Sequence, residues 1–229
     1  MKIATKKGAK NSELIIGPAM AVDVLIFAIR EEKLNVLLIQ INNGPYKGKW
    51  ALPGGIVALE ETLDETAERV LEKKAGIKGI YLEQLYTFGK VDRDVRGRIA
   101  SVAYFALVNS DKFAPKTNEY YADIAWKEVD DLPSMAFDHK EMVRYGVHRL
   151  QSKIEYSNIA YGLLPKEFTL TEIQKVYEVI LGKELDKRNF RKKMKMLDLI
   201  EPTKHVKYGM RNRPAEMYKF KKRSLVFTK

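Results

Sequence analysis

The chain has 229 residues, which is enough for one large domain or two small ones. It contains no cysteine and no run of about 18 apolar residues, so a disulfide scaffold and a membrane span are both excluded. The net charge of +11 is uneven, because residues 151–229 carry 19 basic and 9 acidic residues while residues 1–150 are nearly neutral. This asymmetry predicts a module that binds a polyanion, joined to a domain without strong charge.

The first segment of the chain is polar. It lacks the apolar stretch of a secretory signal, and we expect residues 1–17 to form a flexible tail. Together with the absence of cysteine, this predicts a protein of the cytoplasm.

Two apolar runs follow the tail. Met20–Ile29 and Asn35–Ile41 predict a pair of mostly buried strands, separated by a polar turn. A loop rich in glycine and proline, residues 42–49, then leads to Trp50. We expect the Trp50 side chain in the core or in the wall of a pocket.

The next stretch predicts a turn and a helix. A Gly-Gly turn at residues 54–55 precedes Thr62 and Glu65, whose spacing is that of a capping box. Apolar residues recur after them at helical spacing, and Gly76 is expected to end the helix.

Three further strands are predicted, over Ile80–Gly89, Ile99–Val108 and Tyr121–Leu132, the last ending in a turn. A helix follows from about Lys140 to Ser152, with apolar residues on one side. His139 stands at its start, where a histidine is more often a cap or a packing residue than a catalytic base.

The polar loop of residues 90–98 allows two interpretations. Its arginines, Arg93 and Arg98 among them, alternate with Asp92 and Asp94 and could form ion pairs within the loop. Alternatively, one or two of them present their guanidinium groups to a phosphate or sugar of a ligand.

The basic C-terminal part predicts two helices. Thr169 and Glu172 form a second capping box, and Gly182 is expected to end the first helix. Asp186 caps a second helix that continues to about Leu199. Its residues form two opposed stripes, an apolar one and a basic one, which are Phe190, Met194 and Leu197 against Arg188, Arg191, Lys192 and Lys195.

The pattern is typical of a helix-turn-helix whose second helix enters the DNA major groove, although a basic stripe is more often a solvated face. Asn189 could read adenine, and Arg188 or Arg191 guanine. A predicted hairpin after the helix would complete a winged helix, and its basic residues are Lys204, Lys207, Arg211 and Arg213. These residues and the basic stripe, with Asn189, are the predicted DNA contacts.

The first helix and its flanks resemble the Nudix box. The matching positions are Gly55, Glu61, Arg69, Leu71, Gly76 and Ile77. In Nudix hydrolases three glutamates of the helix hold a divalent metal, and these fall on Val70, Lys73 and Lys74 here. The resemblance implies a Nudix fold. Since Mg²⁺ requires oxygen ligands, the departure at these three positions implies that the fold carries no metal, cofactor or catalytic residues.

Over residues 20–222 the sequence resembles the NrtR-type transcriptional regulators. This resemblance implies an α+β protein with a Nudix-like effector-binding domain at residues 18–155 and a winged-helix DNA-binding domain at residues 156–229. It also implies a homodimer on double-stranded operator DNA, and an effector that is ADP-ribose, a related nucleotide or a sugar such as arabinose.

The residues expected at the effector come from the box, the polar loop and their surroundings. They are Trp50, Glu61, Arg69, Lys73, Asp92, Arg93, Arg98 and His139. Two alternatives to a regulator remain, which are a Nudix hydrolase of a nucleotide-diphosphate sugar such as ADP-ribose and a module that binds RNA or protein.

Overall fold

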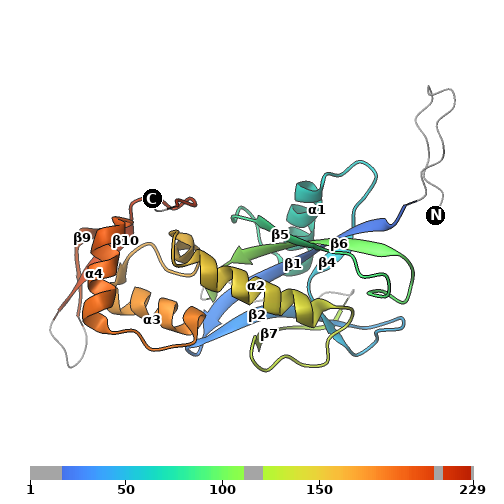
Figure 1. The fold of residues 1–229 in the computed structure, drawn as a ribbon, viewed down its shortest axis with the longest axis horizontal. Helices are drawn as coiled ribbons and strands as arrows, with labels where there is room; N and C mark the ends of the chain where they lie inside the picture. Colours follow the sequence, from blue (N-terminus) through green and yellow to red (C-terminus); the bar gives the residue numbers. More distant parts are fainter. Residues whose placement is uncertain (1–16, 111–120, 209–213, 228–229) are drawn as a thin grey trace, which may run out of the picture.

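The computed structural model describes residues 17–110, 121–208 and 214–227. The predicted N-terminal tail lies almost entirely outside these ranges, as do the wing residues Arg211 and Arg213. Figure 1 shows two parts side by side, a sheet with α1 and α2 and a smaller unit with α3, α4, β9 and β10.

The larger part is built on a mixed sheet in the order β3-β2-β1-β6-β5, with β4 paired to β1 and β7 paired to β2. The central strand β1 is antiparallel to β2 and parallel to β6. The strands are β1 (Ala19–Arg30), β2 (Lys33–Ile41), β3 (Trp50–Ala51), β4 (Gly54–Ile56), β5 (Glu83–Phe88), β6 (Ile99–Leu107) and β7 (Tyr121–Glu128).

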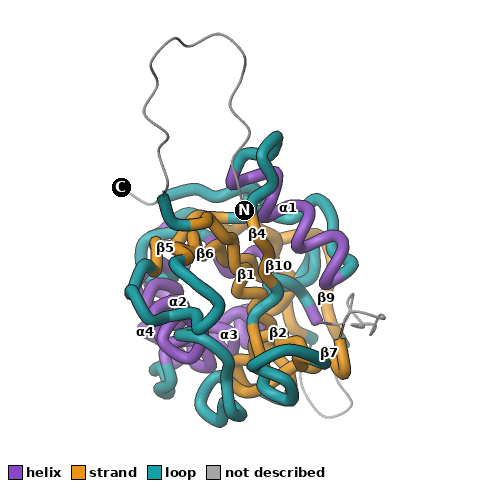
Figure 2. The backbone as a smooth tube through the Cα atoms, turned by 90° about the vertical axis from the view of Figure 1, so that its right-hand side faces the viewer, coloured by secondary structure: helices purple, strands orange, loops and turns teal. Residues whose placement is uncertain are grey.

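A helix covers each face of this sheet, because alternate residues of β1 point to opposite sides. Val22, Val24 and Ile26 are buried in one cluster with α1 (Leu63–Val70), whereas Leu25 and Phe27 are buried in another with α2 (His139–Lys153). Figure 2 shows α1 and α2 on opposite sides of the strands. The prediction of a Nudix fold is therefore confirmed.

The box helix has both predicted ends. Thr62 accepts from the Glu65 N–H while the Glu65 side chain accepts from Thr62, and Gly76 closes the helix with φ at +69°. The last turn, Leu71–Ala75, is a π-helix, which the sequence pattern did not predict. A wider turn rotates the residues after Val70 relative to a continuous α-helix.

The smaller part is a winged helix. It consists of α3 (Leu170–Leu181), α4 (Lys187–Leu197) and a sheet in the order β8-β10-β9, with β8 (Phe168–Thr169), β9 (Ile200–Lys207) and β10 (Ala215–Phe220). The capping box at Thr169 and the left-handed Gly182 are both present. The second helix ends at Leu197, slightly before the predicted end, because Asp198 takes the left-handed conformation.

The two parts share one buried cluster, which contains Phe27 of β1 together with Phe168 and Ile173. The 3-10 helix η3 (Ile159–Gly162) packs against β6 so closely that a Cβ on Gly162 would lie 2.8 Å from the Leu107 carbonyl oxygen. The domain boundary near residue 155 stays a prediction. Among the described residues, no helix is both long enough and apolar enough to cross a membrane.

Candidate functional site

A pocket of about 450 Å³ opens at the end of the sheet where the Nudix box begins. Its wall is made by β1, the loop of residues 42–46, the polar loop of residues 93–96 and the start of α2. Residues 51–56, Lys74 and Tyr121 complete the lining, so the cavity brings together stretches that are far apart in the sequence.

Asp23 of β1 lies at the base of this pocket and is buried. It accepts a hydrogen bond from Ser101 Oγ at 2.6 Å, and its Oδ2 lies 3.4 Å from His139 Nε2 and 3.6 Å from Arg93 Nη2. Burial alone would raise the pKa of Asp23, but the contacts with His139, Ser101 and Arg93 outweigh it and lower the pKa. The carboxyl group is therefore ionised at neutral pH.

His139 is buried and connects the box to α2. Its Nδ1 accepts a hydrogen bond from the Leu52 backbone N–H at 2.9 Å, which assigns the ring proton to Nε2, the nitrogen that faces Asp23. His139 therefore packs between the segment before the box and α2 while one edge of its ring lines the pocket.

Arg93 is buried, and its guanidinium group binds Asp138 in a bidentate manner, with Nη2 2.8 Å from Oδ1 and Nε 3.1 Å from Oδ2. Asp138 precedes α2 but makes no side-chain capping bond, since its carboxylate faces Arg93 instead. In the same loop Arg96 binds Asp94 at 2.6 Å. Of the internal ion pairs expected as one of two interpretations of this loop, that of Arg96 with Asp94 is present, whereas Arg93 pairs with Asp138 outside the loop.

Lys74 is the third cation that lines the pocket. Its Nζ donates to the Gly54 carbonyl oxygen and lies 5.4 Å from the centre of the Tyr121 ring. Burial lowers the pKa of Lys74, although the charge of Asp23 opposes this shift. Among the described residues, no carboxylate forms an ion pair with Lys74.

Glu61 and Arg69 bind each other rather than the pocket. Arg69 Nε lies 2.5 Å from Glu61 Oε1, Arg69 Nη2 donates to Ile56 O at 3.2 Å, and Thr66 Oγ1 donates to Glu61 at 3.0 Å. The hydrogen bond from Arg69 lowers the pKa of Glu61 to about 2. The pair fixes the loop between β4 and α1 against the helix.

The box does not fit a divalent cation. Val70 is buried in the core, Lys73 is exposed, and the Lys74 ammonium group occupies the third position. The neighbouring Glu68 and Glu72 are exposed, and Glu72 pairs with Lys78 at 2.5 Å. In the part of the chain that the structure describes, no group of three acidic, histidine or cysteine residues could hold a metal.

Of the residues predicted at the effector, Arg93 and His139 line the pocket. Trp50 is half-buried against the core, with Lys127 Nζ 4.5 Å from its ring centre. Arg98 donates to the Gly89 and Lys90 carbonyls and so closes the polar loop. The predicted residues outside the pocket lining are Trp50, Glu61, Arg69, Lys73, Asp92 and Arg98, and their role at a ligand stays a prediction.

Sequence reasoning missed Asp23, Lys74 and Asp138. A signal existed for two of them. Asp23 is a lone charge within an apolar strand, and Lys74 follows the buried Val70 by four residues on the same helix face. No local pattern pairs Asp138 with Arg93, which is 45 residues away.

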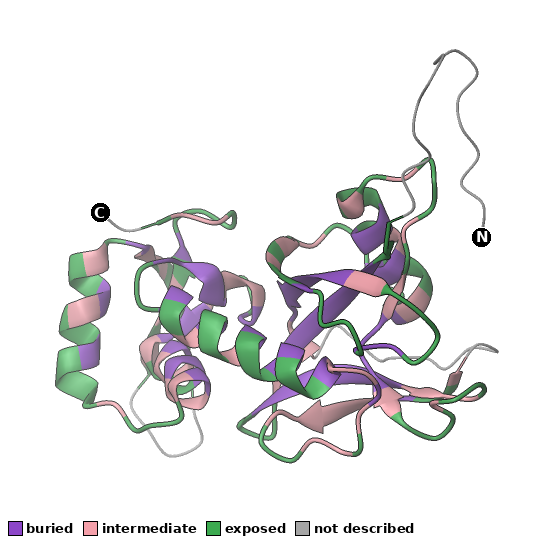
Figure 3. Cartoon of the chain, turned by 45° about the vertical axis from the view of Figure 1, so that its right-hand side comes forward, coloured by how far each residue is buried: buried purple, intermediate pink, exposed green. Residues whose placement is uncertain are grey.

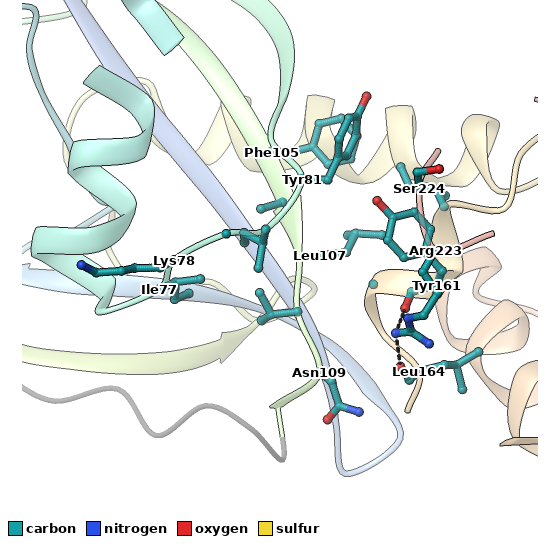
Figure 4. A pocket seen from close by; sticks show the side chains of 16 residues that line it. Ile77, Lys78, Tyr81, Phe105, Leu107, Asn109, Tyr161, Leu164, Arg223 and Ser224 are labelled. Atoms are coloured by element: carbon teal, nitrogen blue, oxygen red, sulfur yellow. Dashed lines mark hydrogen bonds between the residues drawn. The ribbon is translucent and has the colours of Figure 1, made fainter. Parts of the chain in front are cut away.

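A second cavity of about 520 Å³ lies between the sheet and the winged helix. Tyr81 and Leu107 line it from the larger part, and Tyr161 and Arg223 line it from the smaller part (Figure 4). Arg223 donates to the carbonyls of Tyr161, Leu164 and Pro165. These bonds tie the segment after β10 to η3 and make the cavity part of the junction.

The basic face of α4 points away from the rest of the molecule. Phe190 and Met194 are buried against α3, and the opposite side of the helix is exposed, as the outermost helix in Figure 3 shows. The exposed residues include all the predicted ones, which are Arg188, Asn189, Arg191, Lys192 and Lys195. Within the described residues, none of the four cations forms an ion pair. The helix begins at Asp186, which accepts from the Asn189 N–H at 2.8 Å.

The wing is partly described. Lys204 is exposed on β9, and Lys207 pairs with Glu172 at 2.7 Å, which ties the wing to the start of α3. The predicted contacts Arg211 and Arg213 fall outside the described residues.

Family models identify both parts. Residues 18–146 match the NUDIX domain, and residues 160–220 match the NrtR DNA-binding winged helix domain. The chain is 39% identical over 207 residues to the ADPR responsive transcriptional repressor NtrR of Acinetobacter baylyi, and the match covers 89% of this chain and 82% of that protein. The chain belongs to the NrtR family of transcriptional regulators.

Two solved structures of the NrtR from Shewanella oneidensis support this assignment. The protein complexed with a 27mer DNA superposes with a TM-score of 0.77 at 35% identity, covering 88% of this chain and 93% of that one. Its NUDIX domain complexed with ADP ribose has a TM-score of 0.51 at 32% identity, covering 59% of this chain and 90% of that one. The α+β fold predicted for an NrtR-type chain, a Nudix domain followed by a winged helix, is thereby confirmed.

Proposed function

We propose that this protein is an ADP-ribose-responsive transcriptional repressor that binds duplex operator DNA as a homodimer in the cytoplasm. The observation that carries the proposal is the outward basic face of α4, whose cations form no ion pair with any residue that the structure describes, in a domain of the NrtR DNA-binding type. The ligand and the sense of regulation follow the relatives, one of which is an ADPR responsive repressor and another of which is complexed with ADP ribose.

DNA binding follows from the geometry of α4. A helix with an apolar inner face and four exposed cations outside fits the major groove, where its first residues meet the base edges. Arg188 and Asn189 lie in that first turn, and bidentate contacts of Arg to guanine and Asn to adenine are the usual ones. Arg191, Lys192 and Lys195 would contact phosphates, so the affinity should fall steeply with salt.

The ligand would occupy the pocket beside the box. ADP-ribose carries an anionic diphosphate, and the pocket holds an ammonium group, from Lys74, that has no carboxylate partner among the described residues. Arabinose, which is uncharged, would leave that ammonium group without an anion. We therefore favour a nucleotide over a neutral sugar, and we propose that the pocket binds its ligand without hydrolysing it.

Helix α2 connects the pocket with the winged helix. Its first residues, Asp138 and His139, are held by pocket contacts, and near its other end Gln151 Nε2 donates to the Ile180 carbonyl of α3 at 3.0 Å. A ligand that shifts the start of α2 would therefore change how α3 and α4 are held. Differential binding to two such arrangements is what an allosteric response requires.

The test is a DNA-binding titration. Duplexes selected by the protein from random sequence would be measured by fluorescence anisotropy, with and without ADP-ribose. The double variant Arg191→Ala with Lys192→Ala should lose affinity by at least tenfold, while Lys140→Ala with Arg144→Ala on the exposed side of α2 removes the same charge and should change little. Equal affinities for the two double variants would refute the assignment of α4.

A further inference from the structure

The three cations that line the pocket differ in how they are neutralised. Arg93 is bound by Asp138 and lies near Asp23, and Arg96 is bound by Asp94. Lys74 contacts only a carbonyl oxygen and an aromatic ring among the described residues. Lys74 is therefore the pocket cation that forms no ion pair within the described residues, although the more distant charge of Asp23 acts on it.

Burial of this half-buried ammonium group disfavours its charged form and lowers the pKa of Lys74, a cost that the charge of Asp23 only partly offsets. An anionic ligand would remove it. The ammonium group has three N–H donors, and the Gly54 carbonyl uses one of them. Two donors remain for the oxygens of a ligand in the pocket.

Lys74 also stands at one of the three box positions that carry the metal-binding glutamates in Nudix hydrolases. Of the other two, Val70 is buried and Lys73 is exposed. The site therefore does not fit a divalent cation, yet a positive charge is still present where the helix faces the pocket.

We propose that the Lys74 ammonium group replaces the divalent cation and binds the diphosphate of a nucleoside diphosphate sugar without metal. This inference rests on the proposed function, because it concerns the ligand of the same pocket. Lysine binds phosphate as a compact point charge. It offers no open coordination position that would lower the pKa of a bound water, so the diphosphate is held and not cleaved.

The test is calorimetric binding of ADP-ribose, inorganic pyrophosphate and adenosine to the full chain, in excess EDTA and in excess Mg²⁺. For the unchanged protein, the Kd of ADP-ribose should be the same in both buffers. Lys74→Met should weaken ADP-ribose and pyrophosphate binding by about tenfold or more in both buffers, because a hydrogen bond to a charged group is lost. Lys183→Met removes an exposed lysine that lies outside the lining of this pocket and should leave all affinities unchanged.

Adenosine has no phosphate and tests whether Lys74 acts only on the anion. The affinity for adenosine should not change in Lys74→Met. An equal loss of affinity for adenosine and ADP-ribose would assign Lys74 a purely structural role and overturn the inference. ADP-ribose binding that requires Mg²⁺ would also overturn it, while leaving the proposed function intact. Pyrophosphate binding through Lys74 without ADP-ribose binding would keep the inference and refute the proposed ligand, and binding of neither would refute both.

If Lys74→Met does not fold, as judged by circular dichroism, Lys74→Gln serves as the second variant, since the amide keeps a donor for Gly54 but removes the charge. It should show the same loss for the two phosphate compounds. The comparison of EDTA with Mg²⁺ on the unchanged protein needs no variant, so the inference can be refuted in either case.

Discussion

The buried pair of Arg93 and Asp138 offers a quantitative test of how the pocket is held together. Arg93→Met keeps much of the side-chain volume but removes the cation that faces both Asp138 and Asp23. Breaking a buried ion pair by removing one partner costs about 3–5 kcal/mol. For a chain of this size each kcal/mol lowers the melting temperature by about 2–4 °C, so we expect a fall of roughly 6–20 °C.

The structure also predicts an asymmetry between the two partners. Asp138→Ala leaves Arg93 with Asp23 3.6 Å away, whereas Arg93→Met leaves two carboxylates without their cation. Arg93→Met should therefore be the more damaging change, and the double variant with Asp138→Leu should cost less than the sum of the single changes.

Thermal denaturation followed by circular dichroism measures these effects. The matched control is Lys90→Met, which breaks an ion pair between the same loop and the same helix, to Glu141 at 2.5 Å. Both side chains of that pair are exposed and screened by solvent, so Lys90→Met should lower the melting temperature much less than Arg93→Met does. If Arg93→Met and Lys90→Met lower the melting temperature equally, the reasoning about burial is wrong.

Three further predictions concern the Nudix box, the contact between the two parts of the chain, and the response of DNA binding to ADP-ribose. The pKa of Glu61 is lower in the folded state than in the unfolded chain, so its ionised form stabilises the fold. This stabilisation is present above the unfolded pKa of about 4.3 and is lost as the pH falls toward about 2. The melting temperature of Glu61→Gln should therefore lie below that of the unchanged protein at neutral pH and approach it in acid. Gly162→Ala places a Cβ against the Leu107 carbonyl and should lower the unfolding free energy in urea by about 1–3 kcal/mol, and no loss would contradict the close approach. Gln151→Leu removes the hydrogen bond to the Ile180 carbonyl oxygen. The DNA affinity without ligand should stay the same, whereas the change in affinity on adding ADP-ribose should become smaller. An unchanged effect of ADP-ribose in the anisotropy assay would exclude α2 as the connection between the pocket and the winged helix.

The elements of the fold could be predicted because their signals are local. Thr62 with Glu65 and Thr169 with Glu172 have capping-box spacing, and both boxes form as expected. The opposed stripes of α4 also follow from spacing within one helix, so the exposed basic face was predictable residue by residue.

The candidate site was harder to predict, because its side chains find partners far away in the sequence. Glu61 and Arg69 were expected at the ligand but neutralise each other, and Arg93 turns inward to Asp138. Of the two adjacent lysines, the sequence pattern predicts Lys73 at the effector, whereas in the π-helical turn Lys74 lines the pocket and Lys73 is exposed. Spacing alone places residues on a helix face but does not show which of them bind each other.

The central claim is that a Nudix pocket without metal ligands controls a basic winged helix. It is tested most directly by the affinity of the full chain for its selected duplex, measured by anisotropy in EDTA with increasing ADP-ribose. The account predicts a change in Kd of at least about fivefold, the lower range of allosteric coupling, and a much smaller change for Lys74→Met. A DNA affinity that does not change with ADP-ribose, or that changes with ADP-ribose only when Mg²⁺ is added, would contradict the account.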